Sequence, residues 1–238
     1  MRFTTLIVSI VIALFFVRQT GNSQTHNPAE PQQPLVSFNG GKGRSLSSKN
    51  RVVSLENPTI VIDVSRELRS IGVINFPLKK VAQVERYIFV RSDKSGKAER
   101  LFIVQFESTL PGIKGGYSFP MTNTTRIGSH DYQTQVGFLN FAQTIAANPG
   151  AEAEQTKVYL NRNGVQVDDD FLVARYARVA SEDKRHELIL FYLENLRDLN
   201  FTRSELEQGG SRSSEREKVF TEFTARAQQS FKVMGDKS

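Results

Sequence analysis

The first half of the chain alternates short apolar runs with polar breaks. Runs of β-branched and aromatic residues that are bounded by Asn, Pro, Gly or charged residues are typical of β-strands. The last two runs flank a polar loop at residues 92–97 that contains a glycine, which predicts a β-hairpin. The strands that we expect here cover residues 52–55, 59–64, 71–76, 84–91 and 101–107.

The spacing of the apolar positions changes to a helical period after residue 130. Tyr132, Val136 and Leu139 fall on one helical stripe, and Asn148-Pro149-Gly150 is a strong stop signal. The pattern predicts an amphipathic helix over residues 131–148.

The β pattern returns after this helix. Asn163-Gly164 lies between the short apolar runs 157–160 and 165–167 and predicts a tight hairpin. A second pair of strands, 171–180 and 186–193, flanks a polar turn. The last strand is apolar on both faces, as expected for a central strand that is covered on each side.

A long helix is predicted near the C-terminus. Ser214 and Glu217 have the spacing of a capping box, with the serine at the N-cap and the glutamate at position N3. The helix is expected to run to about Met234. Its apolar stripe consists of Val219, Phe220, Phe223, Ala227, Phe231 and Met234.

Together these elements predict an α+β domain over residues 51–238. Strands joined by short turns form antiparallel sheets, and two amphipathic helices need an apolar surface to pack against. We therefore expect a curved antiparallel sheet packed against two amphipathic helices, one of them C-terminal. Residues 24–50, rich in Pro, Gly and Ser, are expected to be a disordered polar linker.

Residues 1–23 have the layout of an export signal. Arg2 precedes an apolar run over residues 6–17, which is shorter than the roughly 20 residues that span a bilayer but fits a signal peptide. Gly21 and Ser23 supply the small residues that a cleavage site after Ser23 requires. We expect export to the periplasm or the cell exterior; the alternative is an uncleaved N-terminal helix that anchors the protein.

The composition narrows the class of protein. The chain contains no cysteine, carries a formal net charge of +6 and has 17 Phe and 6 Tyr. The absence of cysteine excludes disulfides, thiolate metal sites and a thiol nucleophile. An exported domain without disulfides must be held together by its core, which suits a bacterial periplasm or cell surface.

Candidate catalytic residues are few. His130 and Asp131 end the irregular Gly/Pro-rich segment 108–131, whose length is typical of a functional loop. An imidazole beside a carboxylate can act as a general base, with Arg126 holding an anion. The alternative is that Ser129 or Asp131 caps the helix and His130 is merely exposed. No nucleophile elbow, phosphate loop or zinc-helix motif is present.

No metal or cofactor site is expected. Residues 168–170 are three consecutive aspartates, which lack the alternating spacing and the distal glutamate of a calcium loop. His186 and Glu187 begin a strand, so their side chains point to opposite faces and do not share a ligand. A cross-strand pair or an exposed position is expected instead.

The excess of basic residues is greatest over residues 66–100, a stretch that holds nine Lys and Arg against four acids and includes most of the predicted hairpin. Its Lys and Arg side chains either protect exposed strand edges from aggregation or form a contact surface for an anionic partner. The candidate binding residues on this basic hairpin are Arg86, Arg91, Lys94, Lys97 and Arg100.

These features favour a non-catalytic binding or accessory module of the bacterial envelope. The alternatives are an enzyme with its site in the 108–131 loop around His130, and a structural subunit of an envelope complex. The expected partners are an envelope protein, an anionic lipid or a glycan, and nucleic acid is not expected for an exported protein. Membrane contact is expected only through an uncleaved N-terminus or the basic hairpin.

Overall fold

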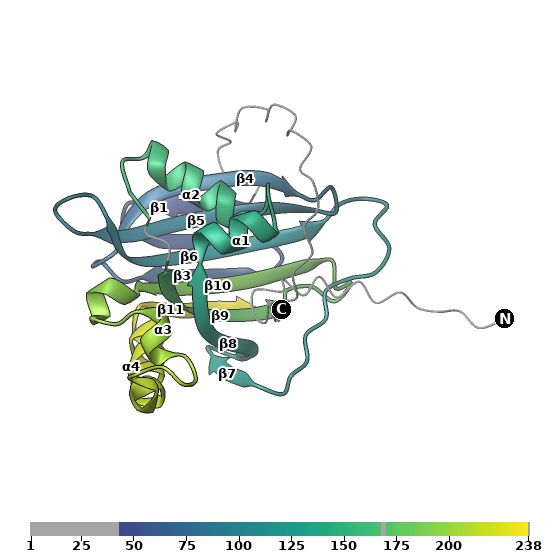
Figure 1. Cartoon of the computed structure of the whole chain (residues 1–238). Helices are drawn as coiled ribbons and strands as arrows, with labels where there is room; N and C mark the ends of the chain where they lie inside the picture. The colour runs from purple at the N-terminus through teal and green to yellow at the C-terminus, as the bar shows by residue number, and fades with distance from the viewer. Residues whose placement is uncertain (1–42, 168–169, 238) are drawn as a thin grey trace, which may run out of the picture.

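The computed structural model describes residues 43–167 and 170–237, and within these ranges the chain forms two antiparallel sheets and four α-helices. The larger sheet has seven strands in the order β4-β5-β6-β10-β9-β8-β7, and the smaller has four in the order β1-β2-β3-β11. Figure 1 shows α1 and α2 across one face of the larger sheet, with the smaller sheet on the other face. The fold is therefore α+β, as predicted.

The larger sheet consists of β4 (Arg69–Leu78), β5 (Ala82–Ser92), β6 (Ala98–Thr109), β7 (Thr124–Ile127), β8 (His130–Asn140), β9 (Asp170–Val179) and β10 (His186–Asn195). The smaller sheet consists of β1 (Arg44–Ser47), β2 (Arg51–Leu55), β3 (Thr59–Val64) and β11 (Phe231–Lys237). The α-helices are α1 (Phe141–Ala147), α2 (Glu152–Arg162), α3 (Arg203–Leu206) and α4 (Arg216–Gln229), with 3₁₀ turns η1 (Leu196–Leu199) and η2 (Ser213–Glu215).

Both faces of the larger sheet are buried. Side chains alternate along β10, so Leu190 and Tyr192 lie in the core formed with the smaller sheet and α4, whereas Ile189 and Phe191 lie in the core beneath α1 and α2. A strand that is apolar at every position is thus central and covered on both sides, which confirms the prediction for residues 186–193.

The hairpin predicted between residues 84 and 107 is confirmed as β5 and β6, which pair from Ala82 with Thr109 to Ser92 with Ala98. The Asp93 carboxylate closes the turn, accepting hydrogen bonds from the backbone N–H groups of Ser95 and Lys97 at 2.8 and 2.9 Å. The strands expected at residues 52–55, 59–64, 71–76, 171–180 and 186–193 are also present, although in two sheets rather than one. The fold begins earlier than expected, because β1 lies within the predicted linker.

The prediction of a helix over residues 131–148 is wrong for residues 131–140, which belong to strand β8. Tyr132 and Val136 are four residues apart, a spacing that fits one face of a strand as well as one face of a helix, and Leu139 extends the helical pattern. The helix α1 begins only after Asn140, whose side chain caps it by accepting a hydrogen bond from the Gln143 backbone N–H at 2.8 Å. It ends at Asn148, as the stop signal predicted.

The hairpin predicted around Asn163-Gly164 is also wrong. Residues 152–162 form the helix α2, whose buried positions Glu152, Thr156 and Leu160 are spaced four apart. Asn163 is the C-cap, and Gly164 adopts a positive φ of 74°. The dipeptide that favours a tight β-turn is equally suited to ending a helix, because both need a left-handed residue.

The C-terminal helix is shorter than predicted. Ser214 lies in the turn η2 rather than at a helix N-cap, and α4 begins at Arg216 without a side-chain cap. A capping box is found instead at Thr202 and Glu205, at the start of α3. Phe231 and Met234 are not helical, because they belong to β11, which pairs with β3 and completes the smaller sheet.

The proposed signal peptide, residues 1–23, and most of the proposed linker lie outside the described residues. Between residues 43 and 237, apart from 168 and 169, no helix combines the length and the apolar character that crossing a bilayer requires.

Candidate functional site

The basic hairpin does not present its five candidate residues together. Arg86 is buried on the face of the sheet that α2 covers, with 4% of its surface exposed. Its guanidinium donates to the Gln105 side chain at 2.5 Å, to the Thr156 hydroxyl at 2.7 Å and to the Glu152 carbonyl at 3.2 Å. Arg86 is therefore not part of the candidate contact surface, because its position in β5 points its side chain to the face of the sheet that α2 covers.

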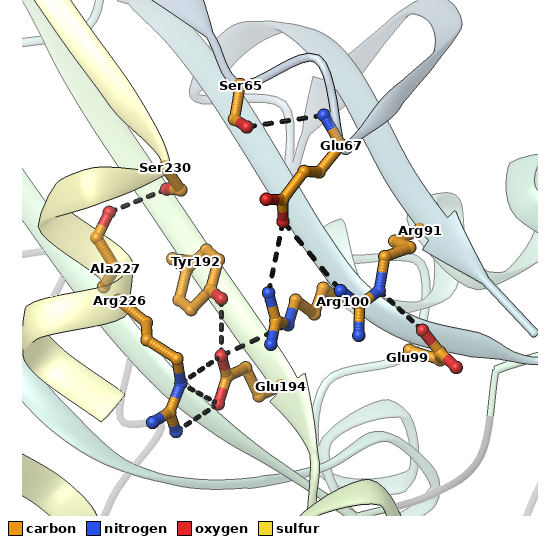
Figure 2. Close-up of polar contacts among 10 residues, drawn as sticks. All are labelled: Ser65, Glu67, Arg91, Glu99, Arg100, Tyr192, Glu194, Arg226, Ala227 and Ser230. Carbon is orange, nitrogen blue, oxygen red and sulfur yellow. Dashed lines mark hydrogen bonds and ion pairs between the residues drawn. The ribbon is translucent and has the colours of Figure 1, made fainter. Parts of the chain in front are cut away.

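Arg91 and Arg100 lie at the surface but are paired with acids. Arg91 contacts Glu99 at 2.6 Å, and Arg100 contacts Glu67 at 3.5 Å and Glu194 at 3.4 Å. Figure 2 shows that Glu194 also receives Arg226 from α4, at 2.7 Å. These two arginines tie the hairpin to its neighbours, so only Lys94 and Lys97 at the turn add to its positive surface.

The second set of candidates, His130 and Asp131, lies at the start of β8 and not at a helix start. Asp131 forms an ion pair with Arg126 of β7 at 3.4 Å, because the two residues are opposite each other in the β7–β8 hairpin. His130 and Asp131 both line a hollow of about 290 Å³, here termed the loop pocket. Its lining residues are Tyr117, Ser118, Phe119, Met121, His130, Asp131, Arg178, Val179 and Lys184.

One wall of the loop pocket is the irregular segment 110–123, here termed the covering loop. It docks on the β9–β10 turn, where the Tyr117 backbone N–H donates to the Lys184 carbonyl at 2.8 Å. A Cβ atom added at Gly116 would lie 2.6 Å from that same carbonyl oxygen, so only glycine allows this approach. Arg185 holds the start of the loop by donating to the Leu110 carbonyl at 2.7 Å.

The lining of the loop pocket is mostly basic and aromatic. Lys184 and His130 supply basic side chains. The Arg178 guanidinium donates to the Tyr132 hydroxyl and to the Val179 carbonyl, each at 3.2 Å, and the single lining carboxylate, Asp131, is paired with Arg126. The aromatic rings of Tyr117 and Phe119 form part of the same wall. This chemistry suits a small organic anion, with its charge on the basic side chains and its apolar part on the rings.

The covering loop contacts a set of buried charged and polar side chains that the sequence interpretation missed, here termed the charge cluster. It sits on the face of the larger sheet that α2 and the covering loop overlie. Each member has at most 8% of its surface exposed. The charge cluster consists of Arg86, Gln105, Glu107, Glu152, Arg175 and Glu187.

Glu107 and Glu187 occupy directly opposite positions on the adjacent strands β6 and β10, and both carboxyl groups are buried on the same face of the sheet. Burial raises the pKa of Glu187 well above its usual range, and the neighbouring Glu107 carboxylate raises it further. Burial also raises the pKa of Glu107. The Tyr117 hydroxyl donates to Glu107 at 2.9 Å, which connects the charge cluster to the covering loop.

Two arginines compensate the acids of the charge cluster. Burial lowers the pKa of Arg86 to about 10 and also lowers the pKa of Arg175. The Arg175 guanidinium donates to Gln133 at 3.2 Å and lies 5.4 Å from the centre of the Phe119 ring, but its buried Nε–H has no hydrogen-bond partner. Cation–π contact with Phe119 gives the covering loop a second attachment to the cluster.

The remaining sequence candidates are accounted for separately. His186 contacts Ser108 across the strand pair, with 2.7 Å between its Nδ1 and the serine hydroxyl, which confirms the expected cross-strand pair. Of the three consecutive aspartates, 168 and 169 lie outside the described residues, and Asp170 accepts a hydrogen bond from Asn140 at 2.8 Å. In the described part of the chain, no three His, Cys, Asp or Glu residues are grouped as metal ligands.

Comparison of the chain with models of protein families, with curated proteins and with solved structures finds no match.

Proposed function

We propose that this chain is an exported, non-catalytic binding module of the bacterial envelope, and that it takes a small organic anion in the loop pocket. The observation that carries the proposal is the lining of that pocket. It combines the basic side chains of Lys184 and His130 with the aromatic residues Tyr117 and Phe119, and its one carboxylate, Asp131, is paired with Arg126. A free metabolite with a carboxylate and an apolar part has the matching chemistry.

Export is supported by the N-terminal sequence. An apolar run at residues 6–17 follows Arg2, and Gly21 and Ser23 supply the small residues of a cleavage site after Ser23. Expression of the whole gene in a bacterial host followed by N-terminal sequencing of the periplasmic fraction tests this part. A start at Gln24 supports cleaved export, whereas Met1 retained in the membrane fraction indicates an anchored protein.

Ligand binding is tested with benzoate, and with benzyl alcohol as an uncharged ring of similar size. Benzoate should raise the melting temperature of the protein, because a ligand that binds only the folded state stabilises it. Lys184→Glu reverses one charge of the pocket and should abolish the shift, while benzyl alcohol should give none.

Lys94→Glu is the matched control, since it makes the same charge change on the exposed turn of the basic hairpin. This variant should retain the benzoate shift. Loss of the shift in Lys94→Glu with retention in Lys184→Glu would assign the contact to the basic hairpin instead. The absence of any shift in the wild type up to millimolar benzoate would contradict the loop pocket as a site for this ligand class.

A hydrolase is the second candidate, because Ser118 joins His130 and Asp131 in the lining of the same pocket. It predicts turnover of p-nitrophenyl acetate that Ser118→Ala abolishes. The binding module predicts no turnover above the rate of the Ser118→Ala variant.

A further inference from the structure

We propose that Glu107 and Glu187 form a proton-binding site that regulates the loop pocket. One proton on this pair keeps the covering loop docked, and loss of the proton releases it. The inference depends on the proposed function only for the identity of the ligand, because the docking of the loop is measurable without one.

The first step is the position of the proton. Glu107 accepts hydrogen bonds from the Tyr117 hydroxyl at 2.9 Å and from the Gln105 amide at 2.8 Å, and it faces Glu187 across the strand pair. A carboxylate that already accepts two hydrogen bonds is favoured in its charged form. The carboxyl group that holds the proton is therefore Glu187, between the central strands β6 and β10.

The second step is the charge that surrounds the pair. Arg86 from β5 and Arg175 from β9 contribute two positive charges, and Glu152 from α2 adds a negative charge to those of the pair. Three carboxyl groups and two guanidinium groups are neutral together only when one proton is bound. Ionisation of Glu187 therefore leaves a net negative charge in a site that excludes water, which is strongly unfavourable.

The third step links this charge to the loop. The Tyr117 ring lines the loop pocket while its hydroxyl reaches the pair, and Phe119 packs on Arg175. Arg185, which also faces Tyr117, holds only the start of the loop through backbone carbonyls. Undocking the covering loop is thus the local change that brings water to an ionised pair.

The unpartnered Nε–H of Arg175 adds a second route to the same outcome. This buried donor has no hydrogen-bond acceptor in the structure. An ionised Glu187 offers a charged acceptor on the neighbouring strand, and charged acceptors bind guanidinium groups more strongly than a neutral amide does. Reorientation of Arg175 toward Glu187 would remove it from Gln133 and from the Phe119 ring, and the loop would lose that attachment.

The test is hydrogen exchange of the full chain without ligand, followed by mass spectrometry on peptides from residues 110–121. Rates are corrected for the intrinsic pH dependence of exchange. Opening should increase about tenfold per pH unit between the usual carboxyl pKa and the raised pKa of the pair, since one proton is released on opening. Peptides from β5 and β6 report on global unfolding and should remain protected.

Glu187→Gln keeps a donor to Glu107 but carries no titrating proton, so its loop exchange should be independent of pH. Glu182→Gln, on the exposed β9–β10 turn, is the matched control and should behave as the wild type. Tyr117→Phe keeps the ring but removes the hydroxyl, and it should raise loop exchange at low pH. Equal corrected exchange of the wild-type loop at pH 5 and pH 9, or the same pH dependence in Glu187→Gln, would overturn the proposal.

These outcomes are separate from those of the binding proposal. A loop that responds to pH in a protein that does not bind benzoate keeps the proton-binding site and rejects the ligand class. Benzoate binding with a loop that does not respond to pH keeps the binding module and rejects the regulation.

Discussion

The buried carboxyl pair predicts how the stability of the whole protein depends on pH. The pKa of Glu187 is raised by burial and by Glu107, so the folded state holds a proton that the unfolded state releases. The stabilisation from this proton is fully present below the unfolded pKa of about 4.3 and is lost as pH rises toward the folded pKa. Because one proton is released, the free energy of unfolding falls by about 1.4 kcal/mol for each pH unit within that window.

Replacement of Glu187 by glutamine removes this proton while conserving size and a hydrogen-bond donor. The difference in free energy of unfolding between the variant and the wild type should therefore grow with pH, by up to about 1.4 kcal/mol per unit. Urea unfolding at intervals from pH 5 to pH 9 measures it, with Glu182→Gln as the control for a surface charge change. A constant difference between Glu187→Gln and the wild type over this range would refute the argument.

Three further predictions concern the packing around the sheets. Phe223→Ala removes a fully buried ring of α4 and should lower the free energy of unfolding, measured in urea, by about 3–5 kcal/mol. Phe220→Ala removes a half-buried ring and should lower it by less. Equal melting temperatures for Phe223→Ala and the wild type would mean that α4 does not pack on the sheets. Glu194→Gln removes the ion pairs with Arg226 and Arg100 and should cost about 1–3 kcal/mol, an effect that persists in 0.5 M salt because the carboxylate is buried. Gly116→Ala should raise exchange in the covering loop at every pH while leaving exchange in β5 and β6 unchanged, since its Cβ would meet the Lys184 carbonyl.

Strands with one clear interpretation were predictable from the sequence. The short polar loop after residue 91 predicted that the strands on either side of it form a hairpin, and β5 and β6 pair in this way. The strand β10 was recognised as central because a run that is apolar at every position needs cover on two faces. Local pattern was sufficient in these cases because turn chemistry and periodicity agree.

Segments in which one pattern fits two structures were not predictable. The spacing of Tyr132 and Val136 in β8 fits both a helical stripe and one face of a strand, and pairing with β7 and β9 decides the outcome. Asn163-Gly164 suits a β-turn and a helix end alike, and the packing of Leu160 on the larger sheet selects the helix α2. Phe231 continues the stripe of α4 in sequence, but it pairs with Val64 of β3 instead.

The candidate site was predictable only in part, because charged residues in a predicted strand were expected to be exposed. The loop that lines the pocket and the two residues His130 and Asp131 were identified from local sequence, whereas Arg86 was assigned to a surface that it does not reach. Charged residues in strands are usually exposed, and that expectation fails where both faces of a sheet are covered. Glu187 lies in β10 directly before its apolar run and has the same parity as Ile189, so alternation alone places it on a buried face. The sequence therefore held the signal for a buried charge, but its partner Glu107 follows only from the pairing of β6 with β10, which local sequence does not specify.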